Sequence, residues 1–186
     1  MTNWTRRGVL AAAGGGLVAC TSQPPGVRGS AGERIDAAVD LALTELYGSI
    51  GGSEELARRA LGVLVIPNIT QLGFIAGGAY GEGALRIRGA TVEYYSVSAV
   101  SIGFTLGAQA FNQALFFLTP DALQEFRLAD GWLLGVDAVV VVNTDGAAAG
   151  LDTAIYNRPI VEVIFGQRGL LADASLAGAK YSRIYR

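Results

Sequence analysis

An alternation with a period of two over residues 73–88 constrains the fold more than any other feature of this chain. Small and apolar residues recur at every second position, whereas Tyr80, Glu82, Arg86 and Arg88 occupy the other face. Such alternation predicts a half-buried antiparallel strand. Glycine inside a strand indicates that another part of the backbone approaches closely. The apolar series is Ile75, Gly77, Ala79, Gly81, Gly83, Leu85 and Ile87.

Further strands are predicted on either side of this segment. Short apolar runs predict buried strands at residues 62–66, ending at Pro67–Asn68, and at residues 138–142. Residues 160–165 and 170–179 predict two more strands, joined by residues 166–169. Residues 100–109 also predict one alternating strand, in which Val100, Ile102, Phe104, Leu106 and Ala108 oppose Ser101, Gly103, Thr105, Gly107 and Gln109.

Three helices are predicted. A short one is expected from Ser53, whose hydroxyl can cap it, and another from Thr119–Pro120 to about Arg127. The first covers residues 33–47, where apolar residues recur at helical spacing: Ile35, Val39, Ala42, Leu43 and Leu46. Together the patterns predict an α+β fold, with a β-rich antiparallel sheet or barrel-like domain, N-terminal helices and one mid-chain helix.

The first nineteen residues are typical of an export signal. Arg6 and Arg7 are the only charges before Cys20, and the apolar stretch that follows them is too short for a bilayer span of roughly 20 residues. Leu17, Ala19 and Cys20 fit the pattern that lipoprotein signal peptidase cleaves. We therefore expect residues 1–19 to be removed and Cys20 to carry the lipid. The alternative is that Cys20 is a small apolar residue in a helix.

The export route and destination follow from the neighbouring residues. Residues 5–10 have the order polar-Arg-Arg-x-apolar-apolar of a twin-arginine signal, and a general secretory signal with two arginines is the alternative. Residues 20–31 are expected to form a flexible linker, and residues 32–186 the folded domain. Thr21 after the cysteine favours the outer membrane, facing the periplasm, in a Gram-negative cell.

Charge limits the partners of the domain. The signal holds two of the 14 basic residues and none of the 16 acidic ones, which leaves a net charge of −4 after cleavage. Lys180 is the single lysine. An acidic domain of this kind is a poor candidate for binding nucleic acid.

Four sequence blocks carry a family resemblance. They are GVLVIPNITQLGFIAGGAYGEGALRIR at residues 62–88, then residues 106–109, 134–138 and 169–178. From about Leu61 to Ile184 the chain resembles the SYLF domain, also called the Ysc84 actin-binding domain. The resemblance implies lipid binding, with phosphoinositides for some eukaryotic members and actin binding for others. It also implies that a bacterial member is exported or lipid-anchored in the cell envelope.

The chain departs from this family in three places. Residues 143–146 replace an expected Gly-Pro-Val-Gly, and Tyr94–Tyr95 stand where a tryptophan is expected. The first predicted helix, which is basic in eukaryotic members, carries Asp36, Asp40 and Glu45. These carboxylates would repel anionic headgroups, so phosphoinositides are not an expected ligand. Actin is not an expected partner either, because the chain is expected to be a bacterial envelope protein.

The residues needed for common catalytic sites are scarce. The chain has no histidine, and lipidation would consume its one cysteine. Ser175 or Ser182 with Lys180 is the remaining nucleophile–base pair, although a solvated Lys180 is favoured. Residues 77–83 match neither a phosphate loop nor a dinucleotide fingerprint, and the aspartates are dispersed. No catalytic residue, metal site or cofactor is predicted.

Two functions from different classes remain. The first is a non-catalytic lipid-binding module of the cell envelope, anchored through Cys20. Its headgroup patch would consist of Arg58, Arg59, Arg86 and Arg88, for which a salt-bridged or solvated face is the alternative. The second is a structural envelope protein that acts through protein–protein contacts without a small ligand.

Overall fold

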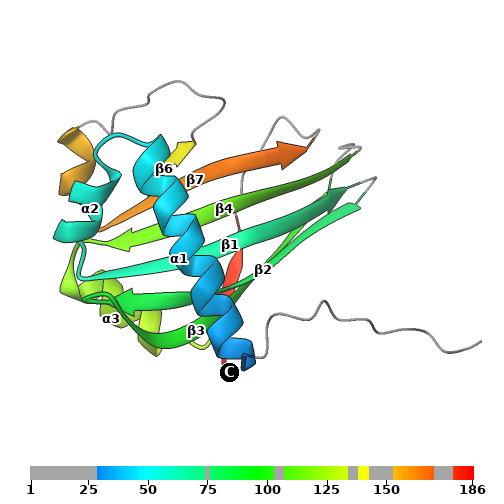
Figure 1. The fold of residues 1–186 in the computed structure, drawn as a ribbon, viewed down its shortest axis with the longest axis horizontal. Helices are drawn as coiled ribbons and strands as arrows, with labels where there is room; N and C mark the ends of the chain where they lie inside the picture. Colours follow the sequence, from blue (N-terminus) through cyan, green and yellow to red (C-terminus); the bar gives the residue numbers. More distant parts are fainter. Residues whose placement is uncertain (1–28, 74–75, 103–106, 134–137, 143–152, 170–177) are drawn as a thin grey trace, which may run out of the picture.

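The computed structural model describes residues 29–73, 76–102, 107–133, 138–142, 153–169 and 178–186. Figure 1 shows the arrangement. The elements are α1 (Ala31–Ser49), α2 (Ser53–Arg59), β1 (Gly62–Gly73), β2 (Ala76–Ile87), β3 (Ala90–Ile102), β4 (Gly107–Phe117), α3 (Pro120–Leu128), β5 (Trp132–Leu133), β6 (Ala138–Val142), the 3-10 helix η1 (Thr153–Asn157), β7 (Ile160–Gly169) and β8 (Lys180–Ile184). This order confirms the predicted α+β class with two N-terminal helices and one mid-chain helix.

The eight described strands form one curled sheet. Their order is β5-β8-β3-β2-β1-β4-β7-β6, and every neighbouring pair is antiparallel except β6 with β7. Although three strands separate β8 from β4, Gln113 on β4 donates a hydrogen bond to the Tyr181 hydroxyl on β8 at 2.7 Å. The sheet therefore curls into a half-barrel, which confirms the prediction of a β-rich, barrel-like sheet.

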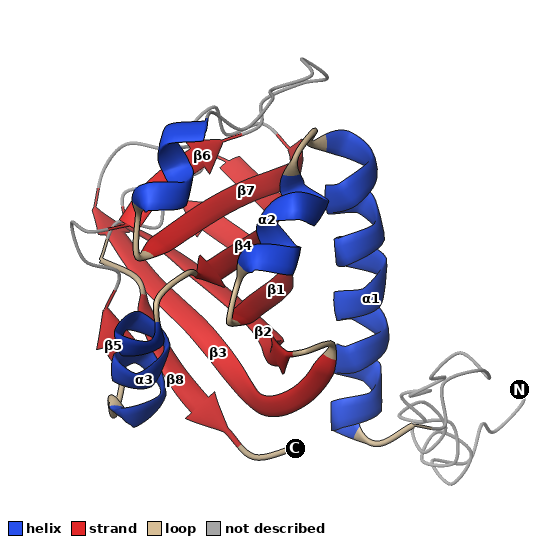
Figure 2. Ribbon diagram, turned by 90° about the vertical axis from the view of Figure 1, so that its left-hand side faces the viewer, coloured by secondary structure: helices blue, strands red, loops and turns tan. Residues whose placement is uncertain are grey.

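Helices lie on both sides of the sheet, α1 and α2 on one side and α3 on the other (Figure 2). An apolar core lies on each side. On the concave side Phe126 of α3 packs among strand residues that include Leu64, Tyr95, Phe117 and Tyr181. On the convex side α1 and α2 cover the outward-facing residues of β1, β2, β4 and β7. The outward-facing residues in this second core include Val63, Val65, Ala84, Ala114, Phe116, Val161 and Val163.

Helix α1 begins at a capping box that fixes its first turn. The Ser30 hydroxyl accepts a hydrogen bond from the Glu33 backbone at 3.2 Å, and the Glu33 carboxylate accepts one from the Ser30 backbone at 2.7 Å. The predicted apolar face is the buried one: Ile35, Val39, Ala42 and Leu46.

The role predicted for Ser53 is wrong, although α2 begins at this residue. Gly52, with φ of 87°, is the N-cap of α2, and none of the described side chains caps the helix. The buried Ser53 hydroxyl instead donates to the carbonyl oxygens of Ile50 at 2.7 Å and Leu46 at 3.1 Å. It thereby fastens α2 to the end of α1, because the last carbonyls of a helix lack partners within the helix.

Pro67–Asn68 does not end the first strand, as predicted, but forms a bulge inside it. The pairing register of β1 with β4 shifts between Ile66 and Ile69, and Asn68 adopts a φ of 51°. The Asn112 side chain accepts a hydrogen bond from the Asn68 backbone at 2.9 Å. A bulge bends a strand without breaking the ladder, so β1 continues to Gly73.

Two further strand predictions are corrected. Residues 100–109 are not one strand, because β3 ends at Ile102 and β4 begins at Gly107; consistent with this, Val100 is 81% exposed and Gln109 is buried. Residues 166–169 are not a turn but the end of β7, where Gly166, with φ of 64°, accommodates a bulge. The strand predicted at 170–179 lies largely outside the described residues, and β8 runs from Lys180 to Ile184.

Candidate functional site

Two of the four arginines predicted to bind a headgroup lie on α2 and pair within that helix. Arg58 and Arg59 both contact the Glu55 carboxylate, at 2.6 Å and 2.7 Å. The hydrogen bond from Arg59 lowers the pKa of Glu55. The Arg59 guanidinium also lies 4.5 Å from the centre of the Tyr156 ring. Since α2 carries two acidic and two basic residues, it has no net charge to offer a ligand.

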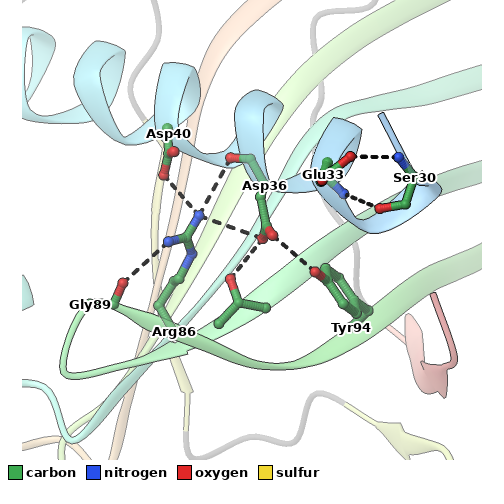
Figure 3. Close-up of polar contacts among 8 residues, drawn as sticks. Ser30, Glu33, Asp36, Asp40, Arg86, Gly89 and Tyr94 are labelled. Carbon is green, nitrogen blue, oxygen red and sulfur yellow. Dashed lines mark hydrogen bonds and ion pairs between the residues drawn. The ribbon is translucent and has the colours of Figure 1, made fainter. Parts of the chain in front are cut away.

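The third arginine holds α1 against the sheet (Figure 3). Arg86 on β2 donates to Asp40 at 2.8 Å and lies 3.6 Å from the Asp36 carboxylate. Asp36 also accepts hydrogen bonds from Thr91 at 2.7 Å and Tyr94 at 2.9 Å. Two of the carboxylates expected to repel headgroups therefore form a structural network with this arginine.

The fourth arginine is solvated. Arg88 is exposed in the two-residue turn between β2 and β3, with φ of 54°. The structure thus pairs three of the four predicted arginines with carboxylates of the chain itself, and this favours the salt-bridged alternative. The signal residues Arg6, Arg7, Leu17 and Ala19, and the lipidation site Cys20, lie outside the described residues.

A different set of basic residues lines a groove beside α3. A hollow of about 470 Å³ lies between α3 and the strands β3 and β8, with Leu61, Glu93 and Leu123 in its lining. A second hollow of about 540 Å³ includes Lys180 and Tyr185. Both are lined by Arg127, Leu128 and Arg183, so they form one curved surface, called here the α3–β8 groove.

Glu93 organises the two arginines of the groove. Arg127 donates to both carboxylate oxygens, at 2.9 Å and 3.2 Å, and Arg183 lies 3.5 Å from the same carboxylate. The Tyr95 hydroxyl donates to it at 2.9 Å. Burial raises the pKa of Glu93, but the hydrogen bonds from Arg127 and Tyr95 and the two positive charges outweigh burial and lower it. Glu93 is therefore ionised at neutral pH and neutralises only one of the two arginines.

Lys180 adds a third positive charge on β8, next to the edge strand β5. Its side chain lies against Gly131, where an added Cβ would be 2.2 Å from the Lys180 Cε atom. Gly131 also has a φ of 86°, which favours glycine. The residue is thus required both for the turn after α3 and for the position of the lysine.

Exposed apolar side chains border these charges. Leu128 is 76% exposed and Tyr185 is 88% exposed, and Leu133 on β5 is also exposed. Large apolar residues exposed beside basic groups are typical of surfaces that contact a lipid headgroup region.

A separate polar cluster lies inside the half-barrel. Gln113 on β4 donates to both Glu162 on β7 and the Tyr181 hydroxyl, and all three side chains are at most 1% exposed. Within the described part of the chain, the Gln113 Oε1 atom has no hydrogen-bond partner. Burial raises the pKa of the Glu162 carboxyl, only partly opposed by the hydrogen bond from Gln113. A carboxylate here is therefore costly to ionise.

Replacing Glu162 with glutamine is expected to increase stability at neutral pH. Folding raises the pKa of Glu162. The contribution of Glu162 to folding stability is therefore most favourable at a pH below its pKa in the unfolded chain. It is lost as the pH rises through its pKa in the folded chain. The Glu162→Gln variant keeps a hydrogen-bond acceptor for Gln113 and removes this loss. Urea denaturation at pH 4 to 8 measures the effect, with exposed Glu125→Gln as the control. Equal pH dependence of the wild type and Glu162→Gln would contradict it.

The sequence pattern did not reveal the groove because its residues come from three separated segments. The sequence pattern relates Lys180 only to a nearby serine and Arg127 only to the end of a helix. The closing residues Tyr181-Ser182-Arg183-Ile184-Tyr185-Arg186 do alternate, which predicts a strand with Lys180 and Arg183 on opposite faces.

Comparison with known proteins adds no assignment. No protein-family model matches the chain, and no curated protein matches it.

None of the described helices is long and apolar enough to cross a membrane. Among the described residues, no three acidic, cysteine or histidine side chains are grouped as metal ligands.

Proposed function

We propose that this chain is a non-catalytic lipid-binding module of the bacterial cell envelope, a lipoprotein anchored through Cys20. In this proposal the α3–β8 groove receives an anionic lipid headgroup. The single observation that carries it is the combination of Arg127, Lys180 and Arg183 with exposed Leu128 and Tyr185 around one groove. The sequence resemblance to SYLF domains supports the same class of ligand.

The charge of the groove favours an anion. Arg127, Lys180 and Arg183 are opposed by Glu93 and by exposed Asp130, which leaves one positive charge on a domain that is acidic as a whole. Arg127 and Arg183 are each more than 40% exposed although both contact Glu93. Their remaining N–H groups can therefore donate to phosphate oxygens.

The groove is not proposed to be catalytic. Ser182 and Lys180 lie on the same strand, but the lysine side chain is drawn towards Gly131. A serine is a weak nucleophile unless a base lies within hydrogen-bond reach of its hydroxyl. Lys180 is better suited to holding an anion, since its exposed ammonium group is a compact positive charge with three hydrogen-bond donors.

Removing two positive charges from the groove is expected to weaken binding to anionic vesicles. In the full chain carrying Cys20→Ser, which has no acyl chain, Lys180→Ala with Arg183→Gln should lower the apparent affinity roughly 30-fold, at about 1 kcal/mol per charge. Co-sedimentation with phosphatidylglycerol–phosphatidylethanolamine vesicles at low and high salt measures it. High salt should reduce the difference.

The matched control removes two charges elsewhere. Arg58→Ala with Arg59→Ala changes the net charge by the same amount and should alter the affinity less than about threefold, since α2 lies outside the groove. Equal losses in the two variants would indicate a response to net charge alone. An unchanged affinity in the Lys180 and Arg183 variant would overturn the proposal and favour a structural protein that contacts other proteins.

A further inference from the structure

Part of the convex face of the sheet carries exposed apolar residues in register. Val100 on β3 pairs with Gly78 on β2, and Gly78 pairs with Leu72 on β1. In the adjacent row Ser98 pairs with Tyr80. Directly paired residues point to the same side of a sheet, so these five residues form one surface, called here the open strip. Leu72, Tyr80 and Val100 are 58%, 53% and 81% exposed.

Helix α1 leaves the open strip uncovered. The helix packs over Val63, Val65 and Ala84, at the other end of the same strands. In Figure 1 the ends of β1 and β2 nearest their connection extend beyond α1. The convex face is thus half buried under α1 and half open.

The open strip lacks charge and borders the α3–β8 groove. The row of Ser98 and Tyr80 continues to Thr70 on β1 and to Lys180 on β8. Lys180, a lining residue of the groove, is therefore next to the strip on its β8 side. The nearest acidic side chain along β2, Glu82, is paired with Arg186. A neutral apolar surface with a lysine at its edge suits a bilayer interface, where leucine, valine and tyrosine side chains partition favourably.

The chain also enters the domain on this face. The first turn of α1 lies against β3: an added Cβ at Gly32 would be 2.8 Å from the Tyr94 hydroxyl. Tyr94 is on β3, the strand that also carries Ser98 and Val100. Tyr94 and Val100 are six residues apart, roughly 20 Å along a strand. Ten residues separate Cys20 from Ser30, a reach of at most about 35 Å. A lipid on Cys20 would therefore keep the open strip close to the membrane surface.

We propose that the open strip lies in the bilayer interface and sets the orientation of the domain on the membrane. This inference rests on the proposed function and adds the face that touches the lipid. With Leu72, Tyr80 and Val100 in the headgroup layer, Lys180 lies at the level of the phosphates. The α3–β8 groove then opens at the edge of the contact, where a headgroup can enter it.

An environment-sensitive label tests the orientation. Cys20 is the only cysteine, so Cys20→Ser leaves the full chain free for one new cysteine. Ser98→Cys carries an NBD label on the open strip, Leu128→Cys carries one at the groove, and Glu54→Cys carries one on exposed α2 as the control. Fluorescence is recorded with phosphatidylglycerol–phosphatidylethanolamine vesicles, with and without brominated acyl chains that quench NBD.

The inference predicts a blue shift and quenching at Ser98→Cys and neither at Glu54→Cys. In addition, Leu72→Ser with Val100→Ser should lower vesicle affinity about tenfold without changing the circular dichroism spectrum. A response at Leu128→Cys with none at Ser98→Cys would overturn the orientation and leave the groove proposal standing. No response at either position would overturn both. A concentration-dependent shift at Ser98→Cys without vesicles would show that a second copy covers the strip, and would also overturn it.

Discussion

Replacing Gly83 with alanine is expected to destabilise the domain by about 4 kcal/mol or more, a large part of the roughly 5–15 kcal/mol that stabilises a typical domain. A Cβ at this position would lie 1.9 Å from the Val65 carbonyl oxygen and 2.7 Å from the Ile66 Cα atom. Both are backbone atoms of β1, so no side-chain rotation relieves the clash. Thermal and urea denaturation followed by circular dichroism measure the loss.

Gly78→Ala on the same strand is the matched control. Its added Cβ would have only the Ala99 carbonyl oxygen nearby, at 3.7 Å, which is an ordinary contact. This variant should change the free energy of unfolding by less than about 1 kcal/mol. Similar stability of the two variants would show that β1 does not approach β2 as closely as described.

Replacing Phe126 with alanine is expected to cost about 3–5 kcal/mol of stability. Phe126 is fully buried and is the centre of an aromatic cluster on the concave side of the sheet. Its ring centre lies 4.6 Å from that of Tyr95, 4.8 Å from Phe117 and 5.3 Å from Trp132. The substitution would leave a cavity beneath α3 and loosen the helix that carries Arg127.

Leu128→Ala separates stability from binding on the same helix. Leu128 is 76% exposed, so its truncation should leave the midpoint of urea denaturation within error of the wild type. The proposed function predicts weaker vesicle binding for this variant nevertheless. If Phe126→Ala were as stable as Leu128→Ala, α3 would not be packed against the sheet as described.

Periodicity predicted the elements whose burial repeats regularly. The helix around Val39 and the alternating strand around Gly83 were recognised because each buries one face along its whole length. The close approach expected from the strand glycines is confirmed at Gly83. Thr119–Pro120 predicted the start of α3 correctly because the cap involves only residues close in sequence. The Thr119 hydroxyl accepts a hydrogen bond from the Ala122 backbone.

The remaining errors concern features that depend on contacts distant in sequence. The bulge at Asn68 is held by Asn112, 44 residues away, and nothing near Pro67 distinguishes a bulge from the end of a strand. The prediction for residues 100–109 placed apolar residues inside and polar residues outside. Near the end of β3 the apolar Val100 is exposed instead, and near the start of β4 the polar Gln109 is buried.

The candidate site was missed for a related reason. The groove brings together Arg127 from α3 with Lys180 and Arg183 from β8. These elements are distant in sequence, and the pairing of β5, the strand after α3, with β8 brings them close. The four arginines proposed from the sequence come from two short segments, residues 58–59 and 86–88, which would form one patch only if the second helix packed beside the first hairpin. Arg58 and Arg59 also have an acidic neighbour in sequence. Glu55 lies one helical turn away and forms ion pairs with both of them.

The most direct test of the account is an NMR titration of the full Cys20→Ser chain with a short-chain phosphatidylglycerol below its micelle concentration. The account predicts saturable chemical-shift changes at Arg127, Gly131, Lys180 and Arg183, with the α2 amides unchanged, and a weaker response to short-chain phosphatidylcholine. Shifts centred on Arg58 and Arg59, or no saturable shift with any lipid, would contradict headgroup binding in the α3–β8 groove.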